Sequence, residues 1–205
     1  MIALIDTTAA GGCERAMRGM FAARKQVFVD LLGWQVPVLE GQYEIDQFDN
    51  ADARYLIVTD GGEHHLASAR LLPTTRPHIL DSLFPALCAA PVPRGPDTFE
   101  ITRFCLDRNI TAAQRRDARN RLVSALVVHA LATGVRTYTG VADSAWLAQI
   151  LQFGWDASPL GQIMTDSYGS LGALRINIDG ATPSRLQATG MWIQTHSMQA
   201  ETAAA

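Results

Sequence analysis

The stretch TFEITRFCL at residues 98–106 is a strand pattern with two charges inside it, and it decides the fold. A helix follows, which begins at Thr111 with Gln114 at the capping-box spacing and ends before Gly134. A second strand, Val135–Val141, comes next. This strand–helix–strand order predicts an α/β protein.

The rest of the chain extends this pattern. Residues 14–32 predict an amphipathic helix whose apolar stripe comprises Met17, Phe21, Phe28 and Leu31. Tyr55–Thr59 with Leu66–Leu72 predict a hairpin around Asp60-Gly61-Gly62. Further elements are expected as a short helical turn within 73–87, a short helix from about Asp143 to Gly154, and strands at 162–166 and 173–178. We expect one α/β domain over residues 1–205 with a mixed sheet, and a loosely ordered tail from about residue 185.

Composition excludes several classes of protein. The 205 residues include 17 basic and 20 acidic side chains, a net charge of −3, and 48% hydrophobic residues, which argues against disorder and against general nucleic-acid binding. No apolar run is long enough to span a bilayer, and the first residues do not resemble a secretion signal. The three scattered cysteines have no zinc spacing, so we expect free thiols in the cytoplasm and no metal site.

Charges stand where a core would exclude them. Arg24 falls on the apolar stripe of the first helix, Arg70 lies inside a strand, and Glu100 and Arg103 lie in the strand 98–106. Arg24 could also extend from the edge of its stripe to solvent. An unbroken strand would place Glu100 and Arg103 on opposite faces, whereas a β-bulge would bring them together. With Asp46 and Asp49 in an aromatic-rich loop (33–52), we expect a shared polar cavity.

Other chemistries lack their motifs. The sequence has no nucleophile elbow, Walker loop or HExxH, and no glycine between Asp97 and Thr133 to expose backbone N–H groups to a pyrophosphate. That stretch is rich in arginine instead, which indicates either a solvated helix face or a docking surface for an acidic partner. The arginines of this patch are Arg108, Arg115, Arg116, Arg119 and Arg121.

These residues resemble one family. The chain is similar to the acyl-homoserine lactone synthases, the LuxI-type autoinducer synthases, through RxxVF at 24–28, LGW at 32–34, ExDxxD at 44–49, SARLLPTTRP at 68–77, Phe84 and ExxRF at 100–104. The similarity is dense over about the first 105 residues. It implies a fold like that of N-acetyltransferases, with a twisted mixed sheet flanked by helices and a splay between the parallel strands 98–106 and 135–141.

The resemblance also implies the reaction. The amine of S-adenosyl-L-methionine attacks an acyl thioester, carried on acyl carrier protein by preference or on coenzyme A, and lactonisation then releases 5′-methylthioadenosine. Both molecules are substrates, so no cofactor is expected. The alternative is another acyl-thioester N-acyltransferase that forms no lactone, and a third possibility is a non-catalytic relative that only binds.

The resemblance assigns expected roles. Glu100 would be the base, directly or through a water, with Asp46 as the other carboxylate and backbone N–H groups near Arg103 and Phe104 as oxyanion donors. Trp34 and Phe28 would face adenine or the sulfonium, and Arg24, Arg70 or Arg103 would bind the substrate carboxylate. The expected adenosylmethionine site comprises Arg24, Phe28, Trp34, Asp46, Asp49, Arg70, Phe84 and Phe104, with Arg103 as a catalytic residue.

The acyl pocket is expected beside the splay, although each of its residues could equally be ordinary core. Its candidates are Leu122, Leu126, Val141, Trp146, Leu147 and Leu151. In this family a threonine near the end of the second splayed strand accompanies 3-oxo chains. From Thr139-Gly140-Val141-Ala142 we expect an unsubstituted chain of medium or greater length. Arg108, Arg115, Arg116 and Arg119 are the candidates for carrier docking.

Overall fold

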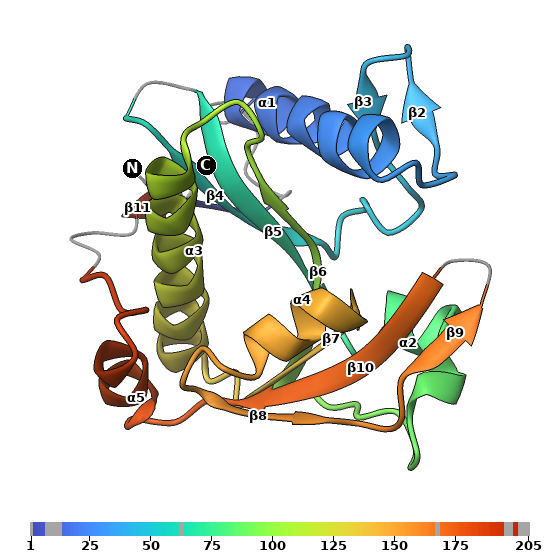
Figure 1. Cartoon of the computed structure of the whole chain (residues 1–205), viewed down its shortest axis with the longest axis vertical. Helices are drawn as coiled ribbons and strands as arrows, with labels where there is room; N and C mark the ends of the chain where they lie inside the picture. Colours follow the sequence, from blue (N-terminus) through green and yellow to red (C-terminus); the bar gives the residue numbers. More distant parts are fainter. Residues whose placement is uncertain (1, 7–13, 62–63, 167–168, 195–198, 201–205) are drawn as a thin grey trace. The chain divides into compact units, whose positions relative to one another are not determined.

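The computed structural model describes residues 2–6, 14–61, 64–166, 169–194 and 199–200 (Figure 1). The chain divides into two compact units. Unit 1 comprises Met1–Leu71, Arg103–Ala125 and Gln194–Ala205, and unit 2 comprises Leu72–Thr102 and Leu126–Ile193. Each unit therefore combines segments that are distant in the sequence.

Unit 1 contains the predicted hairpin and a strand that the sequence pattern missed. The hairpin strands β4 (Arg54–Thr59) and β5 (His65–Pro73) pair antiparallel, and β4 also pairs antiparallel with β1 (Ile2–Asp6). The short β11 (Gln199–Ala200) lies parallel to β1. Nearly every residue of β4 and β5 is buried, including the charged Arg70.

The first helix is confirmed, but its second half changes winding. Residues Glu14–Arg24 form α1, and Lys25–Leu31 continue it as the π-helix η1. The wider turn rotates the later side chains relative to the expected stripe. Phe28 stays buried, whereas Leu31 is 56% exposed, so its predicted place on the buried face is wrong.

The loop 33–52, for which no regular element was expected, contains a small hairpin. β2 (Val38–Leu39) pairs with β3 (Tyr43–Glu44) across a turn in which Glu40 and Gly41 both have positive φ. Positive φ at both central residues is typical of a type I′ turn, which the Gln42 N–H closes on the Leu39 carbonyl at 3.0 Å. The hairpin is too short to be detected by alternation, but it fixes the position of Glu44.

The parallel pair that the opening stretch predicts is present, and its paired residues lie in unit 2. β6 (Thr98–Leu106) lies parallel to β7 (Thr137–Asp143), and α3 (Ala112–Thr133) connects them. Pairing covers only Thr98↔Thr137 to Glu100↔Thr139. The ladder ends there, where the splay is expected, and the mixed α/β fold is confirmed.

The remaining elements of unit 2 complete its sheet. β10 (Gly169–Asn177) pairs antiparallel with β7, β8 and β9, and the predicted strand at 162–166 is shortened to β9. The bounds are α2 Ile79–Ser82, η2 Pro85–Leu87, α4 Ser144–Ile150, β8 Asp156–Pro159, β9 Met164–Asp166 and α5 Thr182–Ala188.

The predicted tail begins inside an ordered helix. α5 extends to Ala188, and Leu186 and Met191 are buried, so residues 185–191 are part of unit 2. Residues 195–198 and 201–205 lie outside the described part of the chain. No helix among the described residues combines the length and the apolar character that crossing a membrane requires.

Candidate active site

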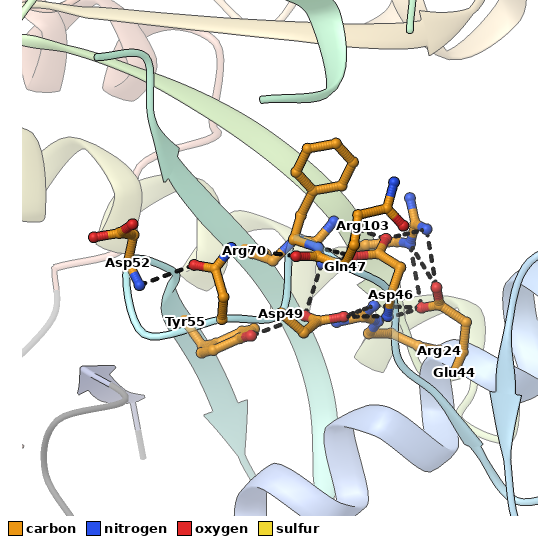
Figure 2. Close-up of polar contacts among 11 residues, drawn as sticks. Arg24, Glu44, Asp46, Gln47, Asp49, Asp52, Tyr55, Arg70 and Arg103 are labelled. Carbon is orange, nitrogen blue, oxygen red and sulfur yellow. Dashed lines mark hydrogen bonds and ion pairs between the residues drawn. The ribbon is translucent and has the colours of Figure 1, made fainter. Parts of the chain in front are cut away.

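Six charged side chains from unit 1 meet in one network (Figure 2). Arg24 ends α1, Glu44 lies in β3, and Arg70 and Arg103 come from β5 and β6, while Asp46 and Asp49 lie in the loop after β3. Arg24, Arg70 and Glu44 are each at most 1% exposed. The structure therefore brings together five of the six charged residues that were expected to share a polar cavity, all except Glu100. The alternative that Arg24 extends to solvent is wrong.

The six side chains form a closed ring in which arginine and carboxylate alternate. Three guanidinium groups balance three carboxylates, so the ring carries no net charge. Burying these charges is tolerable because every one has two oppositely charged neighbours. The successive nitrogen–oxygen distances are 2.5 Å for Arg24–Glu44, 2.9 Å for Glu44–Arg103, 2.7 Å for Arg103–Asp46, 2.6 Å for Asp46–Arg70, 2.7 Å for Arg70–Asp49 and 2.8 Å for Asp49–Arg24.

The loop between the two aspartates is shaped by its own side chains. Asp46 accepts from the backbone N–H of Phe48 at 2.8 Å, and its own N–H donates to Asp49 Oδ2 at 2.9 Å. Such local bonds are the reason that aspartate favours turns. The ExDxxD spacing therefore directs three carboxylates into the ring.

Burial and neighbouring charges shift the pKa values of Arg24 and Asp49 in opposite directions. Burial lowers the pKa of Arg24, but the hydrogen bond and the charge of Asp49 outweigh it and leave that pKa raised. Burial raises the pKa of Asp49, but the bonds and charges of Arg24 and Arg70 hold it well below its usual value. Arg24 and Asp49 are therefore both charged at pH 7.

Aromatic faces cover the arginines. The guanidinium carbon of Arg24 lies 5.1 Å from the Phe21 ring centre, and that of Arg103 lies 5.5 Å and 5.6 Å from Phe28 and Trp34. Phe28 and Trp34 stack with their centres 4.7 Å apart. The π-helix holds this stack, because the Trp34 N–H donates to the Phe28 carbonyl at 2.8 Å.

Arg103 is the open member of the ring. Its φ of +50° is unusual for a residue with a side chain, and it lies within strand β6 at the place where a bulge is expected. Its Nε and Nη2 donate to Glu44 and Asp46, whereas its Nη1 has no hydrogen-bond partner in the described part of the chain. The side chain is 9% exposed, so Nη1 is available to a ligand.

Glu100 belongs to unit 2. It is fully buried, and its Oε1 accepts from the backbone N–H of Leu80 at 3.0 Å. Its neighbour in the β6–β7 ladder is Thr139, whose buried hydroxyl has no hydrogen-bond partner among the described residues. The expectation that Glu100 and Arg103 serve one site stays a prediction.

The expected pocket residues belong to both units. Val141 and Phe84 pack against a buried apolar cluster of Leu80, Leu87 and Ala173 in unit 2. Leu147 occupies the space that a side chain at residue 172 would take, because a Cβ on Gly172 would lie 2.6 Å from it. Of the other candidates, Leu126 is buried, Trp146 and Leu151 are half-buried, and Leu122 is buried but belongs to unit 1, where Phe104 is half-buried.

The arginine patch divides into structural and exposed members. The Arg115 guanidinium donates to the backbone carbonyls of Asp107, Arg108 and Ile110 at 3.3, 3.0 and 3.4 Å. Arg119 donates to the side chain of Asn120, while the side chains of Arg108 and Arg116 are exposed. Arg115 therefore fixes the connection between β6 and α3.

Sequence reasoning left two members out of the site. Glu44 is in the quoted motif but was not assigned to the site, although three arginines facing two aspartates require a third carboxylate for neutrality. Tyr55 donates its hydroxyl to Asp49 Oδ1 at 2.8 Å, and burial, together with the charge of Asp49, raises its pKa, so it stays a neutral donor. Burial likewise raises the pKa of the Cys105 thiol to about 12, which makes it a poor nucleophile.

Comparison with known proteins gives consistent matches. The family profile described as "Autoinducer synthase" matches residues 13–186. A relative from Rhizobium etli named "Acyl-homoserine-lactone synthase" is 40% identical over 152 residues, which is 73% of this chain and 71% of the relative. The solved structure of TofI in a ternary complex with an inhibitor and MTA has a TM-score of 0.77 at 28% identity, over 91% of this chain and 96% of TofI.

A more distant structure has the same fold. An acyl-CoA N-acyltransferase from Pseudomonas aeruginosa superimposes with a TM-score of 0.57 at 14% identity, over 85% of this chain and 98% of that protein. At this identity the likeness concerns the fold alone. The expected similarity to N-acyltransferases is confirmed.

Proposed function

This chain belongs to the autoinducer synthase family, and on that premise we propose that it transfers an acyl group from an acyl thioester to the amine of S-adenosyl-L-methionine. Lactonisation then gives an acyl-homoserine lactone and 5′-methylthioadenosine. The name of the Rhizobium etli relative supports the overall reaction. The MTA in the TofI complex supports the nucleoside product.

The neutral ring with one open guanidinium carries this proposal. S-adenosyl-L-methionine has a carboxylate, an ammonium and a sulfonium, and a site with a large net charge would repel one of them. Arg103 Nη1 supplies a donor for the carboxylate, which ranks it above Arg24 and Arg70, whose guanidinium groups are buried in the ring. The stacked Phe28 and Trp34 offer aromatic faces to the adenine or the sulfonium.

The chemistry divides into two steps. In the first, the ammonium loses a proton to Glu100, directly or through a water, and the amine attacks the thioester carbonyl. The thiolate leaves and takes up a proton, and backbone N–H groups near Arg103, where φ is positive, supply oxyanion donors. In the second, a carboxylate oxygen attacks the carbon that carries the sulfonium, and the neutral thioether departs. Arg103 orients the carboxylate for this attack.

The decisive experiment is a product assay. Purified protein is incubated with S-adenosyl-L-methionine and a panel of acyl-carrier-protein and acyl-CoA thioesters, and products are identified by mass spectrometry. We expect acyl-homoserine lactone and methylthioadenosine in equal amounts, and a strong loss of turnover in Glu100→Gln with the fold preserved. An acylated amine without methylthioadenosine would instead identify an N-acyltransferase that forms no lactone, and no product would contradict the proposal.

Acyl carrier protein is the proposed thioester carrier, because exposed Arg108 and Arg116 match an acidic partner. Arg116→Glu should raise KM for the carrier-protein thioester at least fivefold and leave KM for the coenzyme-A thioester unchanged. Arg18→Glu, at an exposed position of α1, is the matched control. Equal KM values for Arg116→Glu and the wild-type protein would exclude this surface as the docking site of the carrier protein.

A cytoplasmic location agrees with the free cysteines Cys88 and Cys105.

A further inference from the structure

His78 is a buried residue with one ring nitrogen unused. Its side chain is fully inaccessible, and its Nδ1 lies 2.9 Å from the carbonyl oxygen of Arg76. Because a carbonyl only accepts hydrogen bonds, Nδ1 carries the proton. Nε2 therefore presents a lone pair, and it has no partner among the residues that the structure describes.

The ring is an acceptor that stays neutral. Burial lowers the pKa of His78, so the imidazole is uncharged at pH 7. A buried acceptor without a donor costs free energy, and native structures usually supply one. An N–H or O–H group from a bound molecule would remove this cost.

The position of His78 connects it to the reacting end of the acyl chain. It directly precedes α2, two residues before Leu80, whose N–H binds the carboxylate of Glu100. Leu80 is also part of the apolar cluster of unit 2, against which Val141 packs. Val141 lies just beyond the last pair of the β6–β7 ladder. Leu80 therefore joins the proposed base to the apolar residues beside the splay, and His78 lies two residues from Leu80 along the chain.

We propose that His78 selects acyl chains by their oxidation state at C3. Its Nε2 would accept a hydrogen bond from the hydroxyl of a 3-hydroxyacyl thioester. This inference rests on the proposed function. Among the common states of C3, a methylene offers no donor and a ketone directs its own lone pairs at Nε2, whereas a hydroxyl donates. The inference replaces the sequence-based expectation of an unsubstituted chain.

The first test uses the wild-type protein and three thioesters of equal length that are unsubstituted, 3-oxo or 3-hydroxy. We expect kcat/KM to be about tenfold higher for the 3-hydroxy chain than for the unsubstituted chain, and lowest for the 3-oxo chain. A preference for either of the other chains would overturn the inference and leave the lactone synthase intact. Absence of lactone from all three would overturn both.

The second test changes the acceptor. His78→Phe keeps a ring of similar size without an acceptor, and the ratio of kcat/KM between the 3-hydroxy and unsubstituted chains should fall to about one. His78→Gln retains an acceptor and should keep most of the preference. The ratio is internal to each preparation, so a lower fraction of folded protein does not alter it.

A matched control is His65→Phe. His65 is also buried and also has a ring nitrogen without a partner in the described chain, but it lies in β5 of unit 1 and binds Ser68. We expect its variant to keep the wild-type ratio. An unchanged ratio in His78→Phe, or an equal loss in His65→Phe, would contradict a recognition role and indicate that a buried water satisfies Nε2.

Discussion

At the scale of single residues, Asp49 receives more donors than any other member of the ring. Its carboxylate accepts from Arg24 through two nitrogens at 2.8 Å each, from the Tyr55 hydroxyl and from the Asp46 N–H, and it pairs with Arg70 at 2.7 Å. Removing one partner of a buried ion pair leaves the other charge without compensation. Asp49 is therefore the position at which a neutral substitution should be most costly.

Asp49→Asn should lower the free energy of unfolding by about 3–5 kcal/mol, because two buried arginines lose a shared counter-charge. Urea unfolding at pH 7 measures this. Glu14→Gln is the control, since its partner Arg18 is 65% exposed and the change should cost less than about 0.5 kcal/mol. Equal effects of the two substitutions would contradict a buried, closed ring.

Tyr55→Phe isolates one donor to the ring. It should cost about 2 kcal/mol, because the lost bond has a charged acceptor. Tyr138→Phe removes a bond of similar length, 3.0 Å, to the neutral carbonyl of Leu126 and should cost about 1 kcal/mol. Urea unfolding of both variants gives the comparison, and a larger loss in Tyr138→Phe would argue against the ring as the main polar determinant.

At the scale of elements, two sets of side-chain hydrogen bonds stabilise the connection from β6 to α3. The predicted capping box is confirmed, because the Thr111 N–H donates to Gln114 Oε1 at 2.9 Å and the Gln114 N–H donates to Thr111 Oγ1 at 3.3 Å. The Arg115 guanidinium binds three carbonyls of the same connection. The stretch that replaces a glycine-rich loop is thus held by side chains.

Arg115→Met should therefore destabilise the protein by about 1–2 kcal/mol, whereas Arg116→Met, at the neighbouring exposed position, should stay within about 0.5 kcal/mol of wild type. Thermal unfolding of the two variants makes the measurement. Identical unfolding temperatures would mean that the carbonyl contacts of Arg115 contribute nothing. For the same reason, Arg116 is the cleaner position for testing carrier binding.

Local patterns predicted the elements better than they predicted their details. Apolar spacing at the helical period located α1 and showed that Arg24 falls on its apolar stripe. Runs of strand-forming residues located β4 to β7. It missed the π-helix and so misplaced Leu31, since a change in winding leaves no mark on a 3.6-residue pattern. The ring itself required pairing between distant segments, such as Arg103 with Glu44, which spacing along the chain does not encode.

At the scale of the whole molecule, buried histidines set the pH dependence of stability. Burial lowers the pKa of His65 to about 4, against 6.5 for the free side chain, and it also lowers that of His78. The unfolded chain therefore binds more protons than the native protein between these values. Stability is fully present above pH 6.5 and is lost as pH falls towards 4.

His65 should contribute a slope of up to about 1.4 kcal/mol per pH unit in this range. Urea unfolding at pH 7, 6 and 5 should show the decline, and His65→Phe should flatten it. Asp49 acts at lower pH, because its depressed pKa keeps its contribution intact until the solution falls below its usual titration range. A flat profile in the wild-type protein would show that His65 becomes protonated without unfolding.

The closed ring also restricts how such a sequence can diverge. Each of its six members has two neighbours of opposite charge, so loss of any one leaves two partners uncompensated, and a single replacement elsewhere repairs only one of them. Single substitutions are therefore costly at every one of the six positions of the ring. A lineage that abandons the ring must pass through unstable intermediates or exchange several charges together, so the ring tends to be inherited as a unit.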